Sequence, residues 1–143
     1  MKVVKKSALV PYTAQQMYLL VKDLERYPEF LPWCAGARIE EQFSDGVIGS
    51  VDISKGSLQR TFTTRNVFTQ DKKISLELVE GPFSNLQGAW VFDAIGEHGC
   101  RVSLDLEYAF SSTLASMTIG PVFNLIADKL LDSFVGEADR IYG

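Results

Sequence analysis

The residue types that most often carry catalysis are few and scattered in this sequence. The single histidine, His98, lies in Gly96-Glu97-His98-Gly99, where two glycines predict a solvated hairpin turn. A serine nucleophile needs a base within hydrogen-bonding reach, and His98 is poorly placed to be one. Asp105 and Glu107 share one face of a predicted strand, but the alternation puts that face in solvent. The sequence therefore predicts a protein that is not an enzyme.

Metal and nucleotide cofactors are not indicated either. The two cysteines, Cys34 and Cys100, are far apart and neither belongs to a CxxC pair. With one histidine, they cannot supply the clustered nitrogen and sulfur ligands that zinc prefers. Neither GxGxxG nor GxxxxGK[ST] occurs in the chain. We expect two reduced thiols, no metal and no cofactor.

The charge balance bears on partners. The chain of 143 residues carries a formal net charge of −4, so its overall field repels phosphate backbones, and we expect no DNA partner. Local positive surface is still available from Arg60, Arg65, Lys72 and Lys73. Solvated charges without a partner are the commoner explanation of such residues.

The remaining signal is apolar. The composition is 46% hydrophobic and 11% aromatic, and large side chains occur near expected sheet edges at Phe30, Leu31, Trp33, Phe83 and Trp90. Two hypotheses account for them. The rings either fill the core or line a site for an apolar small molecule, because such sites are mostly hydrophobic with few polar groups.

The first third of the chain predicts a strand, a helix and an irregular loop. Residues 2–10 are rich in valine and end at Pro11, which indicates a strand. Thr13 is a suitable N-cap for a helix over 14–21. Residues 27–34 contain two prolines, and each disfavours α geometry in the preceding residue, so we expect a shaped loop there.

The middle of the chain predicts an antiparallel meander. Short apolar runs alternate with turn signals such as Lys55-Gly56, Gly81-Pro82 and the segment 96–99. In the clearest strand, 100–110, every second residue is apolar. Its expected hairpin partner is 88–95, and Ile74, Leu76 and Leu78 give another strand a similar apolar face. This face needs a cover.

The C-terminal segment provides that cover. From about Thr118 to Tyr142, apolar residues recur at steps of three and four, which predicts an amphipathic helix with Pro121 in its first turn. Such a helix is roughly 37 Å long at about 1.5 Å per residue. We therefore predict a single α+β domain over 1–143, with an antiparallel sheet closed over one long helix.

Several motifs carry a resemblance to a known family. They are Tyr27-Pro28-Glu29-Phe30-Leu31-Pro32-Trp33-Cys34, Lys55-Gly56, Phe62-Thr63-Thr64-Arg65-Asn66, Gly81-Pro82-Phe83 and Leu86-x-Gly88-x-Trp90-x-Phe92. With the order of elements, they resemble the START-like (helix-grip) superfamily, in its coenzyme Q-binding and polyketide cyclase-like branch. The resemblance implies a curved antiparallel sheet wrapped around the long C-terminal helix, with two short helices after the first strand.

The resemblance also implies two functions. The first is binding of ubiquinone or a related isoprenoid lipid between sheet and helix, in support of respiration. Its ligand-facing residues would be Phe30, Leu31, Trp33, Phe83, Trp90, Phe123, Ile126 and Leu130. The alternative follows from similarity to the bacterial ribosome association toxins, and it is binding of the large ribosomal subunit so that the subunits do not join.

The alternative would use the cations Arg60, Arg65, Lys72 and Lys73 as its ribosome-facing residues. A transient membrane contact is compatible with the lipid hypothesis. Residues 1–7 are charged and lead into no apolar stretch of signal-peptide length, and no window is apolar enough to span a membrane. We therefore expect a cytoplasmic protein.

Overall fold

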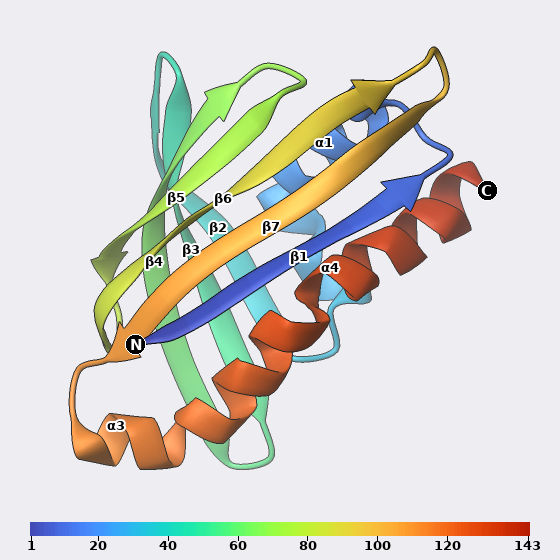
Figure 1. Ribbon diagram of the computed structural model, residues 1–143. Coiled ribbons are helices and arrows are strands. Elements are labelled where there is room, and N and C mark those ends of the chain that lie inside the picture. The colour runs from blue at the N-terminus through green and yellow to red at the C-terminus, as the bar shows by residue number, and fades with distance from the viewer.

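The computed structural model describes all residues, 1–143. Seven antiparallel strands form one curved sheet in the order β1-β7-β6-β5-β4-β3-β2. The strands are β1 (Lys2–Val10), β2 (Cys34–Phe43), β3 (Gly46–Lys55), β4 (Leu58–Thr69), β5 (Lys73–Glu80), β6 (Phe83–Ile95) and β7 (Gly99–Phe110). The helices are α1 (Ala14–Lys22), the 3-10 turn η1 (Leu24–Arg26), α2 (Tyr27–Phe30), α3 (Thr113–Thr118) and α4 (Gly120–Tyr142). The sheet curves around α4 (Figure 1), which confirms the predicted α+β helix-grip fold.

The first strand and helix form where the sequence predicts them. The side chain of Thr13 accepts a hydrogen bond from the backbone of Gln16 at 3.1 Å, and the Gln16 side chain accepts one from the backbone of Thr13 at 2.8 Å. This reciprocal capping box satisfies two backbone donors that the first turn of α1 leaves free. The apolar face of α1 is buried against the sheet through residues such as Met17 and Tyr18.

The segment 27–34 differs from prediction. It was expected to be an irregular loop, but Tyr27–Phe30 forms one helical turn, closed by the backbone N–H of Leu31 donating to the carbonyl of Tyr27 at 2.9 Å. Pro28 is tolerated because it lies in the first turn, where its missing N–H would have had no partner. Pro32 then holds Leu31 in an extended conformation, which ends the turn.

The start of β6 also differs from the prediction, and one helix was not predicted. Strand β6 begins at Phe83, five residues before the predicted start at Gly88, and an irregularity between Phe83 and Asn85 interrupts the period of two. The long helix begins at Gly120 with Pro121 in its first turn, close to the prediction. The separate helix α3 before it was missed, because it buries no residue and so has no apolar stripe in the sequence.

The core consists of two clusters that share α4. The large cluster contains 19 buried residues, among them Leu131, Phe134 and Ala138 from the C-terminal half of α4. The small cluster contains 10 buried residues, among them Phe123 and Ile126 from its N-terminal half. The apolar face of the sheet is therefore covered by one helix in two separate packing units.

Candidate functional site

An internal cavity of about 90 Å³ lies between α4 and the sheet, where the two clusters meet. Trp33 and Phe62 pack against both clusters and line the cavity. Of the 17 lining residues, 15 are hydrophobic, so the cavity offers mainly van der Waals contact and a dry environment. Its walls come from Leu24, Tyr27, Trp33, Val51, Phe62, Thr64, Asn66, Leu76, Leu86, Trp90, Leu104, Leu106, Phe123, Ile126, Ala127, Leu130 and Phe134.

The structure brings together five of the eight residues predicted to face a ligand. The cavity is lined by Trp33, Trp90, Phe123, Ile126 and Leu130. The other three predicted residues lie outside its walls and serve the surrounding packing.

Each of these three has a clear packing role. Phe30 meets the ring of Phe134 with centroids 5.3 Å apart, and Leu31 is a buried member of the large cluster. Phe83 packs edge-on against Phe123 at 4.8 Å in the small cluster. They hold cavity-lining rings in place without reaching the cavity themselves.

Two polar residues in the cavity wall were not among the predicted site residues. Thr64 and Asn66 of β4 are both buried, and the Thr64 hydroxyl donates to Asn66 Oδ1 at 2.7 Å. The Asn66 amide N–H groups and the indole N–H of Trp90 donate no hydrogen bond to the protein. The available signal was the alternation along β4, which puts both residues on the face that carries Phe62.

The cavity wall carries few groups that could react. No carboxylate, histidine, lysine, arginine or cysteine lines it. The hydroxyl of Tyr27 donates to the carbonyl of Val21 at 2.5 Å, and burial raises the pKa of Tyr27 above its ordinary value of 10.0. The wall therefore holds no group suited to proton transfer near neutral pH, and a bound molecule would meet a surface that is almost wholly apolar.

The cavity is small for a whole ligand. At about 90 Å³ it matches the liquid volume of roughly three water molecules. Ligand pockets of proteins usually enclose about 300–1,000 Å³. A quinone ring with its chain would therefore have to move the wall outward or extend through it.

The four cations predicted to face a ribosome do not form one patch. Arg60 lies near the start of β4, whereas Lys72 and Lys73 lie at the β4–β5 turn, so a span of roughly 30 Å separates them at about 3.3 Å per residue. Arg65, between them, stacks its guanidinium 4.1 Å from the ring centroid of Phe43. The arrangement offers separate small cationic spots.

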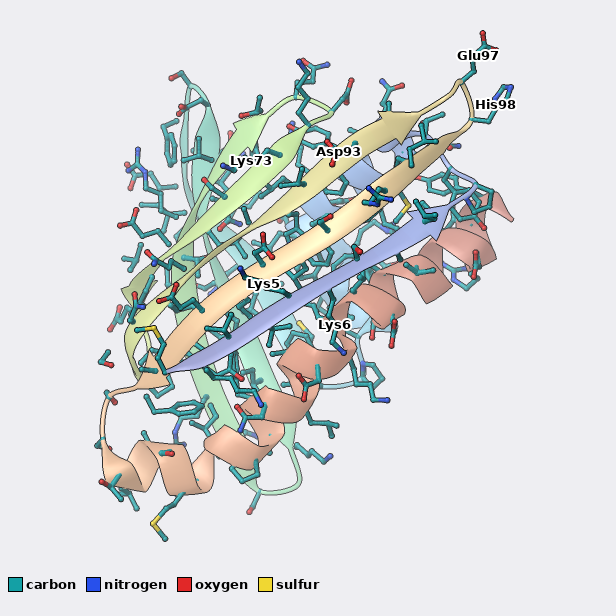
Figure 2. All side chains as sticks on the ribbon, in the orientation of Figure 1. Lys5, Lys6, Lys73, Asp93, Glu97 and His98 are labelled. Atoms are coloured by element: carbon teal, nitrogen blue, oxygen red, sulfur yellow. The ribbon has the colours of Figure 1, made fainter.

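The histidine and the two cysteines lie outside the cavity wall. His98 is 90% exposed beside Glu97 at the tip of the β6–β7 turn (Figure 2). Both cysteines are free and buried, and burial raises the pKa of Cys34 to about 11, which keeps that thiol protonated and unreactive. No group of three or more potential metal ligands is assembled. No helix has both the length and the apolar character needed to cross a membrane.

A curved antiparallel sheet wrapped around one long helix, with an apolar cavity between them, is the helix-grip fold, and comparison with known proteins gives the family. Residues 10–135 match the family described as polyketide cyclase / dehydrase and lipid transport. The chain belongs to this family. It is 43% identical over 143 residues to the ribosome association toxin RatA of Vibrio cholerae, a match that covers 100% of this chain and 99% of the relative.

More distant relatives have other names. The mitochondrial coenzyme Q-binding protein COQ10 of Drosophila melanogaster is 25% identical over 142 residues, covering 96% of this chain and 59% of that protein. Among solved structures, an 18 kDa protein of Caulobacter crescentus is 30% identical with a TM-score of 0.76, covering 100% of this chain and 99% of that one.

An aromatase/cyclase from a Streptomyces species has a similar fold, with a TM-score of 0.82 at 17% identity, covering 97% of this chain and 94% of that chain. At this identity the likeness extends to the fold alone, because one fold can host unrelated functions. The family resemblance predicted from sequence motifs is confirmed by these comparisons.

Proposed function

We propose that this protein associates with the ribosome, binding the large subunit and preventing the subunits from joining. The observation that carries the proposal is the 43% identity to a ribosome association toxin along the full length of both chains. The cavity wall without acid or base groups supports a role in binding and not in catalysis. This action takes place in the cytoplasm, where the ribosomes are.

The proposal is tested with purified protein and dissociated ribosomal subunits. The subunits are mixed with increasing protein at a magnesium concentration that permits joining, and sedimented through a sucrose gradient. We expect the joined ribosome peak to fall and the protein to sediment with the large subunit. Unchanged joining at saturating protein, with no protein in either subunit peak, would contradict the proposal.

The dispersed cations allow the contact surface to be located. The double variant Lys72→Glu/Lys73→Glu reverses two exposed charges at the β4–β5 turn, and Arg60→Glu/Arg65→Glu makes the same change in charge along β4. We expect the turn variant to have the larger effect, since Arg65 is stacked on Phe43 and Arg60 donates to the carbonyl of Gln59 at 2.8 Å.

Each phosphate contact contributes a slope of roughly −0.9 to a plot of log affinity against log salt concentration in duplex nucleic acid. If Lys72 and Lys73 contact phosphates, the turn variant should therefore show a less steep salt dependence than the wild type. Equal effects of the two double variants on affinity and slope would show that the turn has no special role.

A second function is favoured by the cavity. We propose that the cavity takes up part of an apolar ligand bearing a carbonyl group, such as ubiquinone or a related isoprenoid lipid. The supporting observation is the pairing of an almost wholly apolar wall with free donors on Asn66 and Trp90, which suit a carbonyl oxygen. Burial of the ring and chain would supply the affinity, at about 25 cal/mol per Å².

The ligand proposal is tested by titrating a short-chain ubiquinone and following tryptophan fluorescence, since Trp33 and Trp90 line the cavity. Native mass spectrometry of protein purified without detergent shows whether a lipid is retained. The variant Asn66→Leu removes the amide donors, and Gln87→Leu makes a matched change on the exposed face of β6. We expect about tenfold weaker binding only for Asn66→Leu, as for one lost hydrogen bond. Absence of retained lipid and of saturable binding would contradict the proposal.

A further inference from the structure

A surface groove lies beside the internal cavity. It has a volume of about 520 Å³, within the range of small-molecule sites. One side comes from α4 and the other from the end of β3 and the segment after α2. Ten residues line the groove, among them Trp33, Lys55, Val122, Leu125, Ile126 and Lys129.

The groove and the cavity share part of their walls. Trp33 and Ile126 line both spaces, so these two side chains stand between the groove and the cavity. The backbone of Trp33 is fixed to β3, because its carbonyl accepts a hydrogen bond from the N–H of Ser54 at 2.9 Å. Its side chain is only half-buried. A rotation of this indole would join the two spaces while the backbone stays in place.

The charge of the groove is opposite to that of the whole chain. Its lining contains Lys55 and Lys129 and no carboxylate, although the chain carries a net charge of −4. Both lysines are exposed, and neither takes part in an ion pair. Two free ammonium groups from separate elements therefore border one hollow, which favours an anion there.

The same groove exposes apolar surface. Leu125 is 48% exposed on α4, and Val122 one turn before it is half-buried. Exposed leucine beside free lysine suits a molecule that is apolar along its length and anionic at one end, since each part then meets matching chemistry.

We propose that the groove binds a single-chain amphiphile with an anionic head group, a carboxylate or a phosphate. The head group lies between Lys55 and Lys129, and the chain passes Trp33 toward the cavity. The inference goes beyond ribosome association and rests on the second proposed function in one respect, that the cavity accepts apolar groups. Groove and cavity together supply the volume that the cavity alone lacks.

The test compares three probes with the same chain, decanoate, decanol and decyltrimethylammonium, each below its micelle concentration. Binding is measured by isothermal titration calorimetry. We expect decanoate to bind at least tenfold more tightly than decanol, and the cationic probe not to bind. An affinity for decanoate equal to that for decanol would overturn the head-group proposal and leave apolar uptake by the cavity standing, whereas failure of all three probes would contradict both.

Charge-reversal variants locate the head group. Lys55→Glu/Lys129→Glu changes the groove, and Lys2→Glu/Lys5→Glu makes the same change on β1, where both lysines are exposed. We expect the groove variant to weaken decanoate binding about tenfold or more and to leave decanol within about twofold, because only the charge contact is lost. An equal loss in both variants would overturn the assignment to the groove.

Further experiments on the same protein distinguish a free anionic amphiphile from an anionic membrane surface. Decyl phosphate in place of decanoate tests the phosphate head. Vesicles containing anionic phospholipid test a membrane surface. Binding to vesicles without binding of either free amphiphile would overturn the proposal in favour of membrane docking.

Discussion

The two halves of α4 are held to the protein in different ways. The C-terminal half is tethered by polar groups, because the Glu137 carboxylate, with its side chain 3% exposed, accepts hydrogen bonds from Arg26 at 3.0 Å and from Arg140 at 2.7 and 2.8 Å. The hydroxyl of Tyr12 also donates to the Asp139 carboxylate. The contacts of Arg26 and Tyr12 fix α4 to η1 and to the segment after β1, whereas Arg140 lies in α4 itself.

The N-terminal half is held mainly by aromatic packing. The ring of Phe123 meets those of Tyr108 and Phe83 edge-on at 4.7 and 4.8 Å, and two hydrogen bonds, neither of them part of an ion pair, add to this packing. Tyr108 donates to Asn124 at 2.6 Å, and Lys6, which points toward α4 in Figure 2, donates to the carbonyl of Asp128 at 2.7 Å.

This comparison suggests which part of the protein admits a ligand. Val122, Leu125 and Ile126 of the N-terminal half border the groove, whereas the ion-pair tether lies at the other end of the helix. Hydrogen bonds are directional, whereas contacts between rings are dispersion contacts that an apolar ligand can also make. We infer that opening takes place at the N-terminal half and at Trp33 while the C-terminal half stays in place.

The largest expected effect comes from Phe134 in the tethered half. It is 1% exposed and meets the rings of Tyr27, Phe30 and Trp90 at 5.3, 5.3 and 5.1 Å. Phe134→Ala should lower the free energy of unfolding by about 3–5 kcal/mol, since it removes buried area and leaves a cavity. Urea denaturation followed by circular dichroism measures this change in the free energy of unfolding. Leu114→Ala, at a residue 71% exposed, is the control with little change, and a loss below about 1 kcal/mol at Phe134 would contradict the packing described.

The next effect tests the ion-pair tether. Glu137→Gln keeps the shape but removes the charge that Arg140 and Arg26 share, and we expect a loss of about 1.5–3 kcal/mol at pH 7, as for hydrogen bonds to charged groups. Asp132→Asn, on an exposed part of the same helix, is the matched control with a much smaller loss. Equal losses in the two variants would show that the tether adds nothing to stability.

The tether also predicts a pH dependence. Hydrogen bonds from Arg140, and further from Arg26, hold the pKa of Glu137 below its ordinary value of 4.5. A carboxyl with a lowered pKa stabilises the fold fully above its unfolded pKa, and that contribution is lost as the pH falls through the folded value. The difference in unfolding free energy between wild type and Glu137→Gln should therefore be constant from pH 8 to about 5 and shrink below pH 4.5. A difference that grows on acidification would contradict this assignment.

The sequence was informative about elements and less so about contacts within the site. Alternation in 100–110 and the apolar stripe after Pro121 predicted β7 and α4 closely, because both patterns follow from burial of one face. The two prolines alone suggested a loop at Tyr27–Phe30, yet Pro28 fits the first turn of a helix, which agrees with the second short helix implied by the family resemblance. The helix α3 has no buried face, so no periodicity could indicate it.

The candidate site was predicted in part for the same physical reason. Trp33, Trp90 and the inner face of α4 could be selected as large apolar residues on facing elements, and they line the cavity. Whether a particular ring reaches the cavity or packs behind its wall depends on side-chain geometry, as for Phe83, and not on residue type. Lys55 and Lys129 come from distant parts of the chain, and only the fold brings them to one groove.

The smallest expected effect tests the N-terminal half of α4. Tyr108 is fully buried, which raises the pKa of its hydroxyl to about 12, and its hydrogen bond to Asn124 is a polar tie in this half. Tyr108→Phe keeps the ring contacts with Phe123, and the half-buried Asn124 can turn to water, so the loss should be only about 0.5–1.5 kcal/mol.

Hydrogen exchange followed by mass spectrometry then distinguishes the two halves. In Tyr108→Phe, amides of residues 122–130 should exchange faster while those of 131–142 keep their wild-type rates, because the tether at Glu137 is untouched. Glu137→Gln should give the reverse pattern. Equal acceleration along the whole of α4 in either variant would mean that the helix opens as one unit, and entry of a ligand beside Trp33 would then require release of the entire helix.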